Sequence, residues 1–265
     1  MGQQRTALLT TAHAVRLTPL WTAEPSEEKP LTHIIAFATR TGTENDNADS
    51  AATYTAADGV IGSAVIDGVG HTPGTSTLAP VLATVAARVA ATRGALAGLL
   101  SAAQLVADPG PGGNEPNAAA VVAVTFPDGT TTIAWVGDCD AYGWNGHTLT
   151  RYTTPHTLGE QLRHGGIDPE VAREYDNRIK TSLAHAVVAT VSETETTDPV
   201  VILTSDGVSD QITPAELHTL VRRHTDPQEL ARALVAAASD AADGYRDDTT
   251  TLVIAVQPST DSTHS

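Results

Sequence analysis

The sequence predicts a single α+β domain in which helices pack on antiparallel sheets. An Ala- and Leu-rich run over 76–106 has apolar residues at helical spacing. Short β-rich segments follow it, separated by turns of hairpin type at Pro127-Asp128-Gly129 and Asn145-Gly146. No linker or internal repeat divides the 265 residues, so we expect one folded body.

The elements are expected in a definite order along the chain. A strand over 60–66 comes first, and the long helix over 76–106, with Gly94 and Gly98 as points of interruption, ends at the Pro- and Gly-rich cluster 108–113. Four strands of an antiparallel meander follow, over 119–126, 131–136, 141–144 and 148–152. Two short helices, a strand, two helices and a last strand complete the prediction, over 158–164, 169–175, 200–204, 214–223, 227–241 and 250–256.

Composition excludes several classes of protein. With 31 acidic and 15 basic side chains the net charge is −16, which argues against binding to nucleic acid or anionic membrane and leaves cations as partners. A hydrophobic content of 41% is enough for a core, so the chain is not disordered as a whole. The single cysteine, Cys139, forms neither an internal disulfide nor a thiolate zinc site and is expected to be a buried filler.

The sequence also lacks the signals of export and of membrane insertion. The first 20 residues have no unbroken apolar stretch of signal-peptide type. The apolar runs fall far short of the ~20 residues that a membrane span requires. We therefore expect a cytoplasmic protein.

Aspartates stand at the ends of apolar segments, where a solvated surface would not place them. They are Asp67, Asp138, Asp206 and the pair Asp247-Asp248. A single Asp before Gly is ordinary turn chemistry. Several in one chain, each beside a strand, predict carboxylates that converge, and such carboxylates repel one another unless a hard cation lies between them.

These segments, taken in order, resemble the signature motifs of one enzyme family. Asp67-Gly68-Val69-Gly70-His71, Val136-Gly137-Asp138, Ser205-Asp206-Gly207 and Asp247-Asp248-Thr249-Thr250 are similar to those of the bacterial metal-dependent protein phosphatases, type 2C. The resemblance implies an α-β-β-α sandwich of two antiparallel sheets flanked by helices. It also implies a catalytic domain over 31–256, preceded by a segment 1–30 of unknown role and followed by a polar tail, 257–265.

The resemblance further implies the activity and its site. The protein would hydrolyse phosphoserine and phosphothreonine in proteins phosphorylated by a serine/threonine kinase, by means of a metal-activated water. It would use two Mn²⁺ or Mg²⁺ ions, with a third, weaker site. The implied catalytic residues are Asp67, Asp206 and Asp247, and the implied metal ligands are Asp49, Asp67, Gly68, Asp138, Asp206 and Asp247.

The amino-terminal motif leaves two alternatives open. Asn47-Ala48-Asp49 matches its second half, but Glu44 occupies the position of an arginine that would hold the substrate phosphate. Arg40 is the candidate substitute for phosphate binding, and a rival register uses Asp46 in place of Asp49. Because Glu44 weakens the expected phosphate site, a catalytically weak or inactive module that binds phosphoproteins is the alternative function.

Overall fold

The computed structural model describes residues 31–43, 46–70, 73–106, 115–239 and 244–258, within the unit Leu31–Ser265. The predicted segment 1–30, the cluster 108–113 and most of the tail 257–265 lie outside these ranges, as does Glu44.

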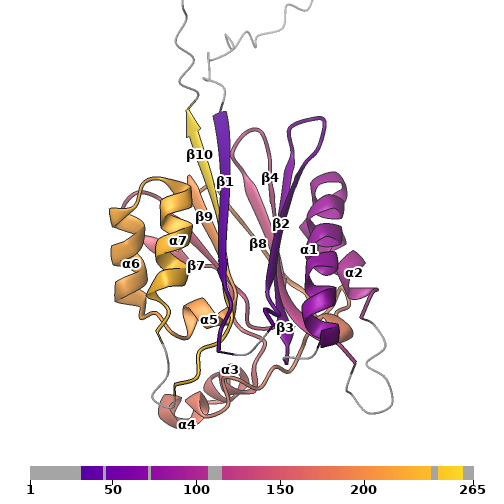
Figure 1. The fold of residues 1–265 in the computed structure, drawn as a ribbon, viewed down its shortest axis with the longest axis vertical. Coiled ribbons are helices and arrows are strands. Elements are labelled where there is room, and N and C mark those ends of the chain that lie inside the picture. Colours follow the sequence, from indigo (N-terminus) through magenta and orange to yellow (C-terminus); the bar gives the residue numbers. More distant parts are fainter. Residues whose placement is uncertain (1–30, 44–45, 71–72, 107–114, 240–243, 259–265) are drawn as a thin grey trace, which may run out of the picture. The chain divides into compact units, whose positions relative to one another are not determined.

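Two antiparallel five-stranded sheets form the centre of the domain (Figure 1). The first sheet has the order β1 (Leu31–Arg40), β10 (Thr249–Pro258), β9 (Val200–Thr204), β6 (Asp140–Trp144) and β7 (Leu149–Arg151). The second has the order β2 (Ser50–Thr55), β3 (Ile61–Val69), β4 (Asn117–Thr125), β5 (Thr131–Val136) and β8 (Ser192–Thr196). The predicted fold class is confirmed.

Helices cover the outer face of each sheet (Figure 1). On the second sheet lie α1 (Pro73–Arg93) and α2 (Ala95–Ala103), and on the first lie α6 (Pro214–Arg223) and α7 (Pro227–Ala237). Between β7 and β8 the chain forms α3 (Leu158–His164), α4 (Pro169–Arg173) and the 3₁₀ helix η1 (Leu183–His185). A single short helix, α5 (Asp206–Ser209), follows β9.

The central strands are mostly apolar because both of their faces are buried. In β4, Ala120 and Val122 pack under the helices, whereas Val121 and Ala123 pack between the sheets. The same layer between the sheets contains Cys139, which is fully buried as expected. The position of an aspartate at the end of such a strand is therefore fixed by the packing of the strand.

The predicted meander is wrong in one respect: its four strands form two hairpins in different sheets. β4 pairs with β5 in the second sheet, and β6 pairs with β7 in the first. The chain crosses between the sheets at Gly137, which has a φ of 90° and where a Cβ would overlap Ala119. Glycine permits this left-handed turn, and it carries the next residue, Asp138, to the end of the sandwich.

Other predicted elements differ in their limits. The long predicted helix is two helices, broken at Gly94 with a φ of 96°. β10 continues to Pro258 because it pairs along its whole length with β1. Strands β1, β2 and β8 were not predicted, and each lies at an edge of its sheet, where one face or both remain in contact with water.

Among the described helices, Gly74–Arg93 is long and apolar enough to span a membrane by length and composition alone. Its residues Leu82, Ala83, Ala86 and Ala90 are buried in the core beneath the second sheet. Packing in the core therefore accounts for the apolar composition of this helix.

Candidate metal centre

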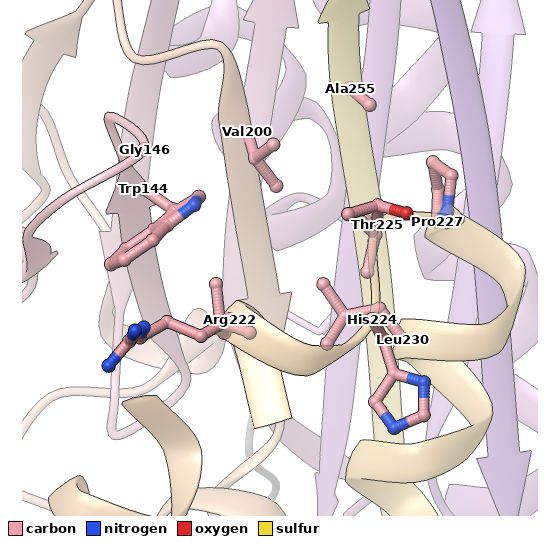
Figure 2. Close-up of a pocket in the computed structure, with 11 residues that line it drawn as sticks. Trp144, Gly146, Val200, Arg222, His224, Thr225, Pro227, Leu230 and Ala255 are labelled. Atoms are coloured by element: carbon pink, nitrogen blue, oxygen red, sulfur yellow. The ribbon is translucent and has the colours of Figure 1, made fainter. Parts of the chain in front are cut away.

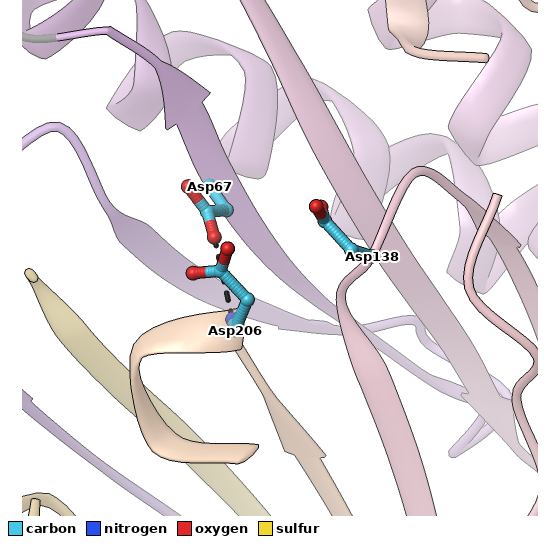
Figure 3. Close-up of side chains that lie close together, drawn as sticks. All are labelled: Asp67, Asp138 and Asp206. Atoms are coloured by element: carbon cyan, nitrogen blue, oxygen red, sulfur yellow. Dashed lines mark hydrogen bonds between the residues drawn. The ribbon is translucent and has the colours of Figure 1, made fainter. Parts of the chain in front are cut away.

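Three aspartates from different elements meet at one end of the sandwich (Figure 3). One carboxylate oxygen from each of Asp67, Asp138 and Asp206 lies within 4.8 Å of the other two. Asp67 is near the end of β3, Asp138 follows β5, and Asp206 begins α5 directly after β9. The backbone N–H of Asp206 donates to Oδ2 of Asp67 at 3.3 Å, which joins the two sheets at this point.

Burial and mutual repulsion raise the pKa of all three carboxyls. Burial is the largest cause for Asp67, followed by the charges of Asp206, Asp49 and Asp138. For Asp138 and Asp206, burial and neighbouring aspartates raise the pKa to about 7. The ionised cluster is therefore unstable by itself, and a cation at its centre would favour the charged form.

Asp49 lies beside this cluster, whereas Asp46 is exposed. The pKa of Asp49 is raised by burial and by the charges of Asp206 and Asp248, against the opposing hydrogen bonds of Ser205 and Thr250. Of the two registers that the sequence leaves open, the structure thus brings the Asp49 side chain, and not that of Asp46, to the site.

The two neighbouring aspartates that precede β10 have different surroundings. Asp247 contributes to the raised pKa of both Asp138 and Asp206, and its Oδ1 accepts the backbone N–H of Asp248 at 2.9 Å. Asp248 accepts the backbone N–H groups of Gly42 at 2.7 Å and Ala48 at 2.6 Å. Asp247 therefore repels Asp138 and Asp206, whereas Asp248 holds the loop before Asp49 by hydrogen bonds to its backbone.

Gly68 lies in close contact with the same loop. Its backbone N–H donates to the carbonyl oxygen of Ala48 at 3.2 Å. A Cβ at position 68 would lie 2.7 Å from that oxygen and would overlap the side chain of Thr75. Only glycine fits here, so the chain can bring the backbone of position 68 close to Asp49.

The donor set fits a divalent cation. Asp49 Oδ2 and Asp138 Oδ1 are buried and have no hydrogen-bond partner within the described part of the chain. Buried carboxylate oxygens without partners are costly, and a cation would satisfy them. Because the ligand atoms of the cluster are carboxylate oxygens, the site suits Mg²⁺ or Mn²⁺ better than softer metals.

A cavity of about 270 Å³ opens beside Asp138 and reaches α3. Asp210 lines it, and burial together with the charges of Asp206 and Asp140 raises the pKa of Asp210 to about 7. Sequence reasoning missed Asp210. Its only signal is the spacing of four residues from Asp206, which places both carboxyls on one side of a helical turn.

The basic groups that line this cavity already have acidic partners. Arg151 donates to both carboxylate oxygens of the buried Asp140, at 2.7 and 2.8 Å. Arg163 pairs with Glu160 at 3.0 Å and with Asp176. The guanidinium of Arg40, the predicted phosphate ligand, donates to the carbonyl oxygen of Ala238 after α7 at 3.1 Å. The phosphate-binding role of Arg40 stays a prediction.

Comparisons with known proteins agree with this architecture. The family model described as protein phosphatase 2C matches residues 173–244. No protein of curated function matches the sequence. The resemblance to the metal-dependent protein phosphatases is confirmed by the family match together with the fold.

Solved structures of bacterial phosphatases share the fold at low sequence identity. A serine/threonine phosphatase of S. agalactiae has a TM-score of 0.74 at 16% identity, over 85% of this chain and 100% of its own. One from Staphylococcus aureus has a TM-score of 0.69 at 20% identity, over 88% and 98%. The catalytic domain of the phosphatase PstP in complex with 2 manganese ions has a TM-score of 0.66 at 21% identity, over 85% and 99%.

Proposed function

We propose that this chain, a protein phosphatase 2C-like protein, is a metal-dependent protein serine/threonine phosphatase. The observation that carries the proposal is the convergence of Asp67, Asp138 and Asp206 within 4.8 Å. Buried carboxylate oxygens of Asp49 and Asp138 that have no hydrogen-bond partner among the described residues support it, because such oxygens are the ligands that a divalent cation needs.

The carboxylates of Asp49, Asp67, Asp138, Asp206 and Asp247, with the backbone carbonyl of Gly68, would hold the ions. We expect two Mn²⁺ or Mg²⁺, and a third, weaker site at Asp138. When bound, such ions would supply a coordinated water of lowered pKa and would neutralise phosphoryl oxygens, which is the chemistry needed for hydrolysis without a covalent enzyme intermediate. Asp67, Asp206 and Asp247 are the residues to which we assign catalysis.

The chain itself supplies rigidity and a place for the substrate. Asp67 and Asp206 belong to strand ends of different sheets, and the hydrogen bond between them fixes their separation. The cavity beside Asp138 is the space next to the cluster in which we place the phosphorylated residue. The substrates we propose are phosphoproteins of a serine/threonine kinase in bacterial cytoplasmic signalling, without nucleic acid or membrane.

Hydrolysis of p-nitrophenyl phosphate and of a phosphothreonine peptide tests the proposal. Purified protein is assayed with Mn²⁺, with Mg²⁺ and with EDTA, beside Asp206→Asn and the control Asp58→Asn. Asp58 is exposed in the turn between β2 and β3, at the other end of these strands. We expect turnover only with metal, lost to background in Asp206→Asn and unchanged in Asp58→Asn. Full activity in a folded Asp206→Asn protein, or in EDTA, would reject the assignment.

A second candidate function is a module that binds phosphoproteins without turnover. The observation that favours it is that Arg40, Arg151 and Arg163 all have partners already, so phosphate must compete with them. Phosphopeptide binding that needs metal, with no hydrolysis in any metal, is the result that would favour this module over the phosphatase.

A further inference from the structure

A second cavity, of about 310 Å³, lies on the outer face of the first sheet, where α6 and α7 meet it (Figure 2). Its position is remote from the aspartate cluster. Val200, at the start of β9, lines the cavity, and Asp206 follows the other end of the same strand. At about 3.3 Å per residue the two are roughly 20 Å apart, so this cavity is no part of the proposed active site.

The walls of the cavity are apolar and belong to the core. Val253 and Ala255 come from β10, and Val221 and Leu230 come from α6 and α7. Val221, Leu230, Val253 and Ala255 are all buried. These walls are therefore preformed, and a ligand with an apolar body would fill them without rearrangement of the sheet.

Each polar group of the cavity can donate a hydrogen bond. They are the indole N–H of Trp144, the guanidinium of Arg222, the imidazole of His224 and the hydroxyl of Thr225. Trp144 contacts His218 edge-on, with ring centroids 5.4 Å apart, and its indole N–H has no hydrogen-bond partner among the described residues. Arg222 is exposed, and its side chain has neither a hydrogen bond nor an ion pair among the described residues.

The charge of the cavity lining differs from the acidic excess of the whole chain. None of the described residues that line it is acidic, although acidic residues outnumber basic ones by 31 to 15 in the chain. The carboxylate of the exposed Glu229 lies 4.0 Å from Nδ1 of His224, and Asp226 stands between the lining residues Thr225 and Pro227. By contrast, the cavity beside Asp138 contains four acidic side chains. The linings of the two cavities therefore differ in their content of acidic side chains.

We propose that this cavity binds a small organic anion with an aromatic or apolar body. Trp144 and Arg222 lie on one side of the cavity and Thr225 and Pro227 on the other (Figure 2). A ring would pack between Trp144 and the valines, and its carboxylate would accept from the fork of Arg222. A volume of about 310 Å³ lies at the lower end of the range for ligand pockets and therefore suits a small ligand.

Three naphthalene probes of one shape and different charge test this proposal in the full-length protein: 1-naphthoate, 1-naphthalenemethanol and 1-naphthylmethylammonium. Their affinities are measured by calorimetric titration. We expect 1-naphthoate to bind about tenfold tighter than the other two, because a charge-assisted hydrogen bond contributes that much. Equal affinity for the three probes, or no binding of 1-naphthoate at about 5 mM, would overturn the proposal.

Two variants locate the binding. Arg222→Gln should weaken 1-naphthoate about tenfold, whereas Arg223→Gln, the neighbouring exposed arginine that does not line the cavity, should leave it unchanged. Ala255→Leu places extra volume inside the cavity and should abolish binding of all three probes. If both arginine variants behave alike, or if a folded Ala255→Leu protein binds as the wild type does, the site lies elsewhere. None of these measurements depends on phosphatase activity.

Discussion

The carboxylate of Asp248 accepts a hydrogen bond of 2.6 Å from the backbone N–H of Ala48, 200 residues earlier in the chain. Ala48 immediately precedes Asp49, and its carbonyl oxygen accepts the backbone N–H of Gly68, which immediately follows Asp67. The Asp248 side chain thus holds the segment of Asp49, and the backbone of that segment holds Gly68. The two adjacent aspartates therefore differ in role: Asp247 repels the aspartate cluster, and Asp248 holds the loop before Asp49.

This division predicts opposite effects of two adjacent substitutions. Asp248→Asn should lower the free energy of unfolding by about 1.5–3 kcal/mol, because the two N–H donors of Gly42 and Ala48 lose a charged acceptor. Asp247→Asn should leave the metal-free protein at least as stable, because it removes a charge that repels Asp138 and Asp206. Urea unfolding in EDTA measures both. Equal destabilisation by the two substitutions would contradict the division.

The aspartate cluster predicts how stability depends on pH when metal is removed. Asp138 and Asp206 have pKa values of about 7 in the folded protein, above the ~4 of an unfolded chain. The folded state therefore binds more protons than the unfolded state. The stability that these two carboxyls contribute is fully present below about pH 4 and is lost as the pH rises through about 7. Urea unfolding in EDTA between pH 5 and about 8 should show this fall. Asp206→Asn should flatten the profile, as should Mn²⁺ added to the wild type, and a wild-type profile that rises over this range would refute the prediction.

The pairing of Arg151 with Asp140 predicts a loss of stability when it is broken, next to the proposed active site. Asp140 is fully buried, accepts two hydrogen bonds from Arg151 and also accepts from Thr153 and Tyr142. Asp140→Asn should lower the free energy of unfolding by about 1.5–3 kcal/mol. The loss is limited because the Arg151 side chain is 44% exposed, so that water replaces part of its lost contact. A double-mutant cycle with Arg151→Gln should give a favourable coupling between the two side chains. Additive effects would mean that the pair contributes nothing.

The contact between α1 and β3 predicts that Gly62 tolerates no side chain. A Cβ there would overlap the carbonyl oxygen of Ala87 and lie 2.7 Å from the backbone nitrogen of Ala91. Gly62→Ala should therefore destabilise the protein by about 1–3 kcal/mol through overpacking of helix against sheet. Gly165→Ala is the control, because position 165 has a φ of −75° and a Cβ there would come no closer than 3.3 Å to any atom beyond the neighbouring residues. Thermal unfolding of the two variants should differ clearly, and similar midpoints would contradict the argument.

Much of the sandwich was predictable because burial on both faces leaves a local signal. β3, β4, β5, β9 and β10 contain apolar runs that a one-dimensional pattern detects. The edge strands β1, β2 and β8 leave no such signal. β8 reads Ser-Glu-Thr-Glu-Thr and is a strand because it pairs with β5, 57 residues distant at the pair Trp135 and Ser192 (192 − 135). Its conformation is decided by a partner, not by its own residues.

The sequence by itself determined that aspartates stand at strand ends, because an apolar strand followed by Asp and Gly is a local pattern. The tertiary structure decided how these side chains are used. It gives Asp247 and Asp248 different contacts and places Asp49, not Asp46, beside the cluster. It also places Asp210 near Asp206, and it directs the Arg40 guanidinium to the carbonyl oxygen of Ala238. The physical reason is that the position of a carboxylate is set by hydrogen bonds and charges from residues up to 200 positions away. The cavity at Trp144 likewise exists only where strands and helices distant in the chain come together.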